Sequence, residues 1–299
     1  MRDVAAAAPP MPGRSRVLRV AGLVVGGLVV IAAAALAAGE VAWRRATARR
    51  IERLDARAQR ASTRAAPPMR RSDLASLPAP VARYLAFALR EGQPRIRSVR
   101  IRWSGSMRLQ PGGPWSEFTA EQHFTVDPPG FVWDARFRMV PLVPVLVRDS
   151  YVAGTGQMIG RVGGVASVVD EGGTPEMAQS ALARWLGEAA WFPTAFLPGD
   201  GITWQAIDDT TARATATDGA LSVSGEFHFA ASGEMTGMSA MRFRDVNGRA
   251  VLTRFEGHYR GFERRGGVMI PARADVEWVL PDGVYSYWRG APTEVRYAR

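Results

Sequence analysis

The sequence has 299 residues, 47% of them hydrophobic, so the chain is long enough to fold around a substantial core. It contains no cysteine, which excludes disulfide bonds, thiolate metal sites and thiol catalysis. The net charge of +10 lies entirely in residues 1–71, which carry 14 of the 38 basic residues and 4 of the 28 acidic ones, leaving 24 of each sign elsewhere. Because the remainder is neutral, it lacks the positive field that binds nucleic acid, and we expect no nucleic-acid partner.

The first predicted element is a transmembrane helix over residues 17–38, which follows an N-terminal tail of residues 1–16. The segment reads VLRVAGLVVGGLVVIAAAALAA, and Arg19 is its one charged residue. As a helix, Val20 to Ala38 would span roughly 28 Å, close to the hydrocarbon thickness of a bilayer. The alternative is a cleaved signal peptide, because Ala34, Leu36 and Ala38 resemble a small-residue cleavage site.

Charges beside this segment give conflicting indications of its orientation in the membrane. Four arginines (2, 14, 16 and 19) precede the uncharged run that begins at Val20, and seven follow it within residues 44–60, which by itself places the rest of the chain in the cytoplasm. A short tail with Arg14, Arg16 and Arg19, however, is typical of a signal anchor, and large domains translocate despite flanking charge. The sequence predicts a single-pass protein of a bacterial cell membrane with its main domain on the outer side.

Residues 39–71 are predicted to form an Arg-rich helical stalk and a linker. Ile51, Leu54, Ala58 and Ala61 follow helical spacing, and Pro67 with Pro68 places the linker at residues 62–72. We favour a solvated stalk. The other interpretation is a surface-lying or dimerising helix that binds anionic headgroups.

Residues 72–299 are predicted to form one antiparallel β domain with a first helix near residues 79–91. Pro78 and Pro80 open that helix, and the hydrophobic period changes to two from Ile96 onward. In the run over 117–126, Phe118 and Phe124 alternate with polar residues, which indicates a strand with one buried face. Four or five such strands reach Val169.

A second helix is predicted near residues 175–190. Thr174 is a suitable N-cap, Pro175 suits the first helical position, and an apolar stripe follows at Ala178, Leu182, Trp185, Leu186 and Ala189. Turn signals such as Asn247 with Gly248 then recur regularly and predict about seven more strands. The fold class is therefore mainly β (α+β), a curved half-barrel sheet of about 11–12 strands around a packed central helix.

With these elements placed, the chain resembles an uncharacterised bacterial family of membrane-anchored domains of unknown function. The resemblance covers residues 70–299 and rests on LPAPVARYL (77–85), the strand pair from Met107 to Trp133, DSYVAGTGQM (149–158), ARWLGEAAWFPTAFLP (183–198), IPARADVEW (270–278) and YSYW (285–288). More loosely, the expected half-barrel is similar to LolA/LppX-like lipoprotein carriers, and that resemblance implies an apolar concavity.

The ligand-binding candidates lie on the second helix and on the strands that face it. Arg184 and Glu188 are four residues apart beside Trp185 and Trp191, and an ordinary surface pair of this kind would contribute only about 0.3–0.5 kcal/mol. If the helix fills the concavity, the pair could hold a polar headgroup against an apolar wall. The other candidates are Trp133, Asp149 and Tyr151.

No catalytic motif is present. Walker, Rossmann and nucleophile-elbow patterns are absent, and GTGQMIGRVGG (154–164) more readily bends a strand than binds phosphate. His123, His228 and His258 each follow a glutamate by two, which places each pair on one strand face, but on the polar face. We expect a solvated surface there, with these histidines as weak metal candidates, and we expect no cofactor.

The sequence supports three functions in this order. The first is non-enzymatic binding of a lipid or other apolar ligand at the cell envelope. The second is a structural or protein-interaction module at the membrane, and the third is a metal-dependent enzyme that uses the Glu-x-His pairs. The oligomeric state is not indicated.

Overall fold

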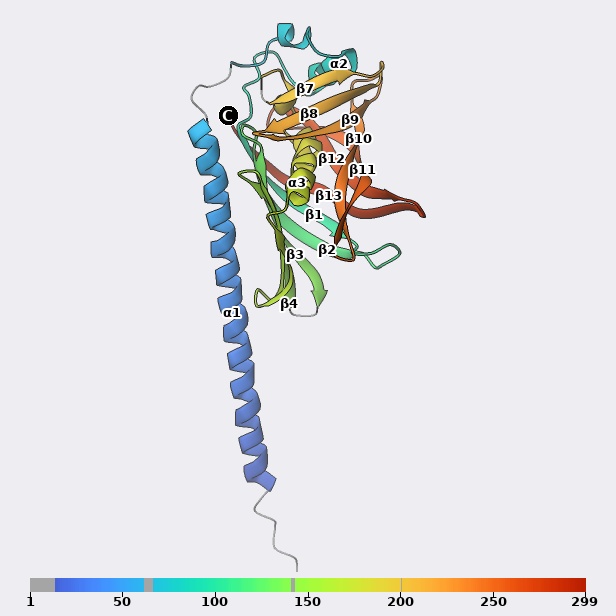
Figure 1. Ribbon diagram of the computed structural model, residues 1–299. Helices are drawn as coiled ribbons and strands as arrows, with labels where there is room; N and C mark the ends of the chain where they lie inside the picture. Colours follow the sequence, from blue (N-terminus) through green and yellow to red (C-terminus); the bar gives the residue numbers. More distant parts are fainter. Residues whose placement is uncertain (1–13, 62–66, 141–142, 200) are drawn as a thin grey trace, which may run out of the picture.

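A computed structural model describes residues 14–61, 67–140, 143–199 and 201–299 (Figure 1). Most of the predicted N-terminal tail, residues 1–13, and residues 62–66 of the predicted linker lie outside the described residues.

One continuous helix, α1 (Arg14–Ala61), contains both the predicted membrane segment and the predicted stalk. Its apolar part has a mean hydropathy of 2.6 and is 0% buried against the rest of the chain. A helix of this length and composition fits a membrane span or a signal sequence. It projects well away from the rest of the molecule (Figure 1).

The second half of α1 packs on the outer face of strands β3 (Gly130–Val140) and β4 (Val143–Val152). Trp43 and Leu54 are buried there, at 5% and 1% exposure. Trp43 Nε1 donates a hydrogen bond of 2.8 Å to Asp134 Oδ1, and Thr47 Oγ1 donates one of 2.9 Å to Asp134 Oδ2. The expectation of a solvated stalk is therefore wrong, because one side of this helix is covered by the sheet.

A single antiparallel sheet makes up most of the remaining structure. It contains β3, β4 and the strands β1 (Ser98–Met107), β2 (Ser116–Thr125), β5 (Thr155–Val162), β6 (Ala166–Gly172), β7 (Ile202–Ala206), β8 (Thr211–Asp218), β9 (Leu221–Phe229), β10 (Met235–Val246), β11 (Arg249–Arg265), β12 (Val268–Leu280) and β13 (Gly283–Ala298).

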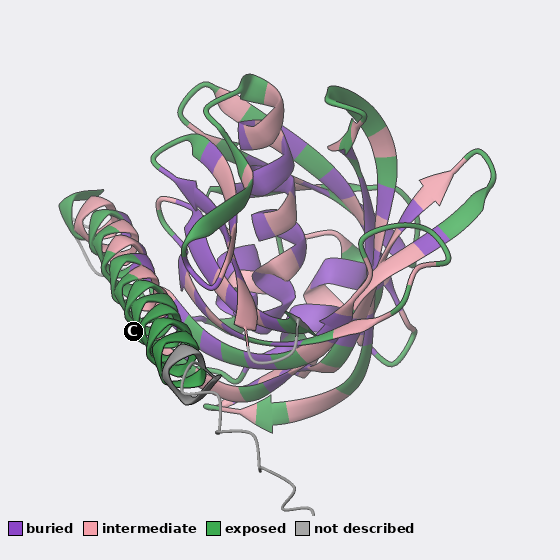
Figure 2. Cartoon of the chain, turned by 90° about the horizontal axis from the view of Figure 1, so that it is seen from below, coloured by how far each residue is buried: buried purple, intermediate pink, exposed green. Residues whose placement is uncertain are grey.

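The strand order is β6-β5-β4-β3-β2-β1-β13-β12-β11-β10-β9-β8-β7. Two meanders are thus joined at a central seam, where β1 pairs with β13 from Ser98 opposite Ala298 to Met107 opposite Trp288. The sheet is open and strongly curved, as predicted (Figure 2). It has 13 strands rather than 11–12, because residues 155–172 form a complete hairpin, β5–β6.

Helix α3 (Pro175–Glu188) follows edge strand β6 and, through the 3-10 turns η2 (Ala189–Trp191) and η3 (Pro193–Phe196), leads to the other edge strand, β7. Its path crosses the concave face of the sheet (Figures 1 and 2). Thr174 caps it as predicted, accepting a 3.2 Å hydrogen bond from the Met177 backbone. The whole predicted stripe is buried, so α3 is the centre of the core rather than a surface helix.

Helix α2 (Ala79–Ala88), preceded by the 3-10 turn η1 (Arg71–Leu74), covers one end of this core. Val81, Tyr84 and Leu85 are fully buried. The helix ends at Ala88 rather than near residue 91, because Leu89 is extended with φ −117° and ψ 163°. The end of the sheet away from α2, where the hairpins β1–β2, β3–β4, β5–β6, β10–β11 and β12–β13 turn, is called the mouth below.

Candidate functional site

Three charged side chains meet inside the concavity, where α3 faces β4. Arg184 and Glu188 are one helical turn apart, and Arg184 donates two hydrogen bonds of 3.0 Å, from Nε and Nη2, to Glu188 Oε1. Arg184 Nη1 donates a third bond of 2.6 Å to Asp149 Oδ2. We call Asp149, Arg184 and Glu188 the charge cluster.

Gln122, on strand β2, extends the hydrogen-bond network of the charge cluster. Gln122 Nε2 donates a 2.8 Å hydrogen bond to Glu188 Oε2, and Trp103 Nε1 donates one of 2.9 Å to Gln122 Oε1. Neither Gln122 nor Trp103 was among the predicted site residues. The sequence did contain a signal for Gln122, because this polar residue occupies an inward-facing position between Phe118 and Phe124 in the alternating strand.

Aromatic rings surround the guanidinium of Arg184, whose central carbon lies 4.9 Å from the ring of Phe131 and 5.2 Å from that of Trp133. The side chains of the charge cluster are only 11–16% exposed. Ionic groups in such surroundings lose most of their hydration and depend on one another for compensation.

The cluster holds one guanidinium and two carboxylates, and burial changes the pKa of both Glu188 and Arg184. Burial raises the pKa of Glu188 and outweighs its hydrogen bonds from Arg184 and Gln122. Burial also opposes the charge on Arg184, but the carboxylates of Glu188 and Asp149 more than offset it and raise the pKa of the guanidinium. Arg184 therefore stays charged, whereas Glu188 holds its proton more tightly than an ordinary glutamate.

Trp133 differs from Trp185 and Trp191 in its hydrogen bonding. The indole N–H groups of Trp185 and Trp191 donate to the carbonyl oxygens of Thr125 and Pro271, at 3.0 and 3.1 Å. The Nε1 of Trp133 is buried and has no hydrogen-bond acceptor in the described part of the chain. A buried donor without an acceptor is costly, so this N–H is available to a ligand beside the charge cluster.

Between the charge cluster and the mouth, the concave face is mainly apolar and only partly covered, with Arg242 buried over the rings of Phe255 and Trp278. Side chains here pack against the core yet keep part of their surface exposed; they are Met107, Val145, Val147, Val276, Leu280, Tyr287 and Trp288. Burial raises the pKa of Tyr287, whose ring stacks on that of Trp278 at 5.9 Å. Figure 2 looks toward this side of the sheet, with α3 inside the curve.

The remaining predicted ligand residues lie apart from the cluster. Tyr151 donates a 2.8 Å hydrogen bond to Asp218 Oδ2, and Arg57 of α1 binds the same carboxylate. This contact ties α1 and β4 to the β8–β9 turn. The ring of Trp191 packs edge-to-face on Trp103 at 4.9 Å, and the Trp185 ring is fully buried. The structure thus brings together Trp133, Asp149, Arg184 and Glu188. Tyr151, Trp185 and Trp191 form hydrogen bonds with other parts of the fold.

The histidines lie on the outer face, where each is partly covered rather than fully solvated. Burial and the neighbouring Arg100 lower the pKa of His123. Among the described residues, one group has the composition of a metal site: Glu256, His258 and Glu277, whose ligand atoms lie within 4.8 Å of one another. His258 Nε2 lies 2.9 Å from Glu277 Oε1, so the two side chains already satisfy each other.

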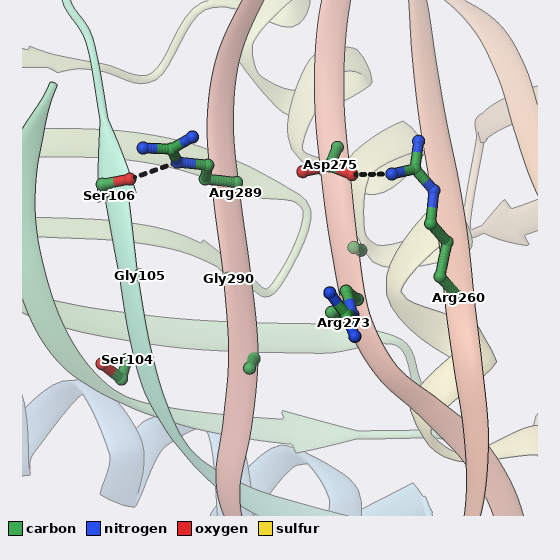
Figure 3. Close-up of a pocket in the computed structure, with 10 residues that line it drawn as sticks. Ser104, Gly105, Ser106, Arg260, Arg273, Asp275, Arg289 and Gly290 are labelled. Carbon is green, nitrogen blue, oxygen red and sulfur yellow. Dashed lines mark hydrogen bonds and ion pairs between the residues drawn. The ribbon is translucent and has the colours of Figure 1, made fainter.

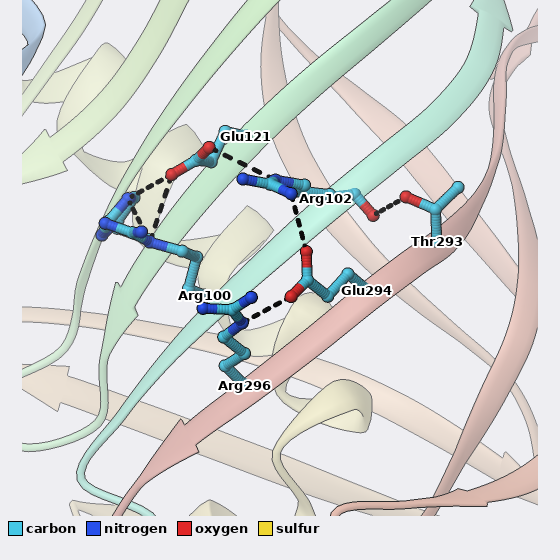
Figure 4. Close-up of polar contacts among 7 residues, drawn as sticks. Arg100, Arg102, Glu121, Thr293, Glu294 and Arg296 are labelled. Atoms are coloured by element: carbon cyan, nitrogen blue, oxygen red, sulfur yellow. Dashed lines mark hydrogen bonds and ion pairs between the residues drawn. The ribbon is translucent and has the colours of Figure 1, made fainter.

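Charged ladders cover the outer face around the β1–β13 seam. Arg102 contacts both Glu121 and Glu294, at 3.7 and 2.8 Å, in a row that Figure 4 shows across β2, β1 and β13. Their side chains are 32–55% exposed, so each pair adds little to stability. This part of the outer face, around the β1–β13 seam, is therefore exposed to solvent.

In the described part of the chain, clefts also lie outside the concavity. One, of about 390 Å³, opens between β1, β13, β12 and β11, where Arg260 binds Asp275 at 3.1 Å and Arg289 Nε donates a 2.7 Å bond to Ser106 (Figure 3). The other, of about 170 Å³, lies between α1 and β4. Arginines provide nearly all of its lining: Arg49, Arg50, Arg53 and Arg148, together with Ala46.

Comparison with solved structures finds distant similarity in fold. A LolA superfamily protein from Nitrosomonas europaea shares 11% identity, with 75% of this chain and 95% of that chain covered and a TM-score of 0.37. A DUF1329 family protein from Desulfovibrio piger also shares 11% identity, with 68% and 86% covered and a TM-score of 0.35. No curated protein matches the chain.

The comparison with family models confirms the predicted resemblance to a family of unknown function. The model of DUF6544, described as a family of unknown function, matches residues 67–290. This range contains the whole charge cluster and all of the sheet except the second half of β13. The chain belongs to the DUF6544 family.

Proposed function

We propose that this protein is a membrane-anchored, non-enzymatic binding protein for a lipid or similar amphiphile. The observation that carries the proposal is the charge cluster with the unpartnered Trp133 N–H, set behind a partly exposed apolar wall. Buried ionic groups seldom add stability over apolar residues of similar size, so a functional reason for retaining them is the stronger explanation.

The polar residues favour a neutral, hydrogen-bond-accepting headgroup. Trp133 Nε1 and Arg184 are hydrogen-bond donors, whereas Asp149 and Glu188 would repel an anionic headgroup in these poorly hydrated surroundings. An ester carbonyl or a hydroxyl group meets both conditions. The acyl chain would then lie along Val145, Val147 and Trp288 toward the mouth.

The apolar part of α1 provides the anchor in this proposal. We place it across a bacterial cell membrane with the β domain on the outer side. The test is labelling of a single cysteine, Ile207→Cys, with a membrane-impermeant maleimide in intact cells, because the chain has no cysteine of its own. We expect labelling before lysis; labelling only after lysis would place the domain in the cytoplasm.

Native mass spectrometry with lipid extraction tests the ligand. The full chain, purified from membranes in mild detergent, should carry one amphiphile, and Arg184→Met or Trp133→Phe should reduce the bound fraction severalfold. Arg213→Met is the matched control, because Arg213 forms an ion pair with Glu226 on the exposed face, where its side chain is 46% exposed. A folded protein without ligand, or equal loss in the control, would contradict the proposal.

A second candidate function is an interaction module at the membrane. The exposed arginines of α1, among them Arg45, Arg49 and Arg53, favour it. Substituting these three by glutamine would then abolish recovery of a membrane partner while leaving any amphiphile in place.

A further inference from the structure

Exposed apolar side chains outside α1 are concentrated at one end of the sheet. Large hydrophobic residues with at least 40% of their surface exposed lie in or beside the hairpin turns at the mouth: Leu109, Met139, Val165, Val168, Val251, Leu252 and Val284. Within the described part of the chain, the exceptions beyond α1 are Ile207 and Met241. Solvated turns are normally polar, so this distribution needs an explanation.

The alternation of antiparallel strands places these turns together. The hairpins β1–β2, β3–β4, β5–β6, β10–β11 and β12–β13 all turn at the mouth. The turns at the opposite end contain small or polar residues, such as Ala153 with Gly154, Ser232 with Gly233, and Gly266 with Gly267. The molecule therefore has an apolar end and a polar end.

The apolar segment of α1 ends at the level of the mouth. A methyl group built on Gly39 would lie 2.8 Å from Val165 Cγ2, and one built on Gly163 would lie 2.3 Å from Leu36 and 3.1 Å from Val143. The tip of β5–β6 thus touches residues 36–39, the last turn of the apolar run, and Val143 at the start of β4 lies beside that tip. From there α1 runs away from the sheet on the mouth side (Figure 1).

We propose that the mouth is seated on the lipid bilayer, with its hairpin tips in the interfacial layer and the concave face open toward the acyl chains. If α1 crosses the membrane, residues 36–39 lie at the edge of the hydrocarbon, so the β5–β6 tip that touches them lies there too. Exposed apolar residues at this level lose contact with water on seating. Arg138 and Arg249, exposed beside Met139 and Val251, are positioned to meet headgroups.

Trp115 strengthens the assignment of this surface. Its ring follows the β1–β2 turn and is flanked by Arg108 and Arg289, each guanidinium carbon being 4.2 Å from a ring centroid. A tryptophan combined with arginines at the edge of an apolar surface is typical of a membrane interface.

The seating rests on the membrane anchoring proposed above, but not on ligand binding. It makes the bilayer itself the source of the amphiphile, because the mouth would open into lipid instead of water.

Single-cysteine variants of the full chain test the seating, since the natural sequence has no cysteine. Leu109→Cys, Leu252→Cys and Val284→Cys, each labelled with the fluorophore NBD, would be reconstituted in phosphatidylethanolamine–phosphatidylglycerol vesicles with and without nitroxide-labelled lipid. Ile207→Cys is the matched control, because Ile207 and Leu252 are both 46% exposed.

We expect nitroxide lipids to quench the mouth labels at least threefold more than the label at residue 207. Flotation of the vesicles measures anchoring separately. If the protein floats but all four labels are quenched equally, the seating is overturned and the anchor stands. If the protein does not float, both fail. Replacing Leu109 and Val284 by glutamate in the Leu252→Cys variant should abolish its excess quenching, and undiminished quenching would contradict insertion of these tips.

Discussion

Trp133 and Trp185 face the same core but differ in whether the indole N–H has an acceptor. Substituting either tryptophan by phenylalanine removes the same atoms, so the comparison isolates the hydrogen bond. Trp185→Phe leaves the buried carbonyl of Thr125 without this donor, and we expect it to cost about 1–3 kcal/mol more than Trp133→Phe. Urea unfolding of both variants measures the difference. Equal losses would mean that Trp133 already has an acceptor.

Arg184 compensates two buried carboxylates, so its loss should be severe. We expect Arg184→Met to lower the free energy of unfolding by about 3–5 kcal/mol. Arg213→Met removes an exposed pair and should change it by less than about 1 kcal/mol. Denaturation at neutral pH compares the two. Similar small losses would show that the cluster is hydrated.

Glu188 should make stability depend on pH in the direction opposite to most paired carboxylates. Its folded-state pKa lies above the ordinary value of 4.5 because of burial, so the folded protein binds the proton more tightly than the unfolded chain does. This contribution is fully present below pH 4.5 and is lost as the pH rises through the folded-state pKa. Unfolding of the natural protein and of Glu188→Gln across this range should show the stability advantage of the natural residue shrinking with rising pH. An advantage that grows instead would mean that the ion pair dominates.

At the level of single residues, the sequence analysis named Trp133, Asp149, Arg184 and Glu188 as candidates. It did not predict that these four side chains lie together. Arg184 and Glu188 were recognisable from their spacing. Asp149 joins them through a contact between segments 35 residues apart, and no local pattern encodes such a contact. The role of these residues in binding remains a prediction.

Helix α1 is the element for which expectation and structure differ most. The stripe Ile51, Leu54, Ala58 and Ala61 indicated the right helix, but its contacts run along Trp43, Thr47, Ile51 and Leu54, a 4-4-3 spacing visible in the sequence. Alanines and arginines dominate this segment, so its average composition gave no indication that one side of the helix is buried against the sheet.

The docking of α1 gives an expectation at the same scale. Leu54 packs with Val132 and Val152 on the outer face, and Leu54→Ala should destabilise the β domain by about 2–5 kcal/mol. The neighbouring exposed Arg53→Ala should change stability by less than about 0.5 kcal/mol. Denaturation of the full chain in detergent, followed by tryptophan fluorescence, compares the two. If Leu54→Ala is neutral, α1 and the sheet are not coupled.

The helices α2 and α3 and the seven strands after α3 were predictable because caps, prolines and Asn-Gly turns are local signals. The strand count before α3 was too low because β6 is nearly all exposed and shows no alternation.

For the whole molecule, strand order could not be predicted, since pairing of β1 with β13 depends on residues nearly 200 positions apart. The seam nevertheless has a strict requirement at Gly105. A methyl group there would lie 2.3 Å from the Arg289 carbonyl oxygen and 2.7 Å from Phe118 Cζ.

We therefore expect Gly105→Val to destabilise the fold by more than about 3 kcal/mol, whereas Ser104→Val, on the exposed outer face, should be tolerated. Thermal unfolding followed by circular dichroism distinguishes them. A folded Gly105→Val protein of normal stability would require a different seam.

The seam also sets an order of events during synthesis. β13, the last of the thirteen strands to leave the ribosome, occupies the middle of the sheet, between β1 and β12. Until it emerges, the nascent chain has two separate meanders with exposed edges at β1 and β12, a state prone to mispairing. α1 precedes all of these strands, so if it anchors the chain as proposed, the membrane would hold the two meanders in place until β13 is made.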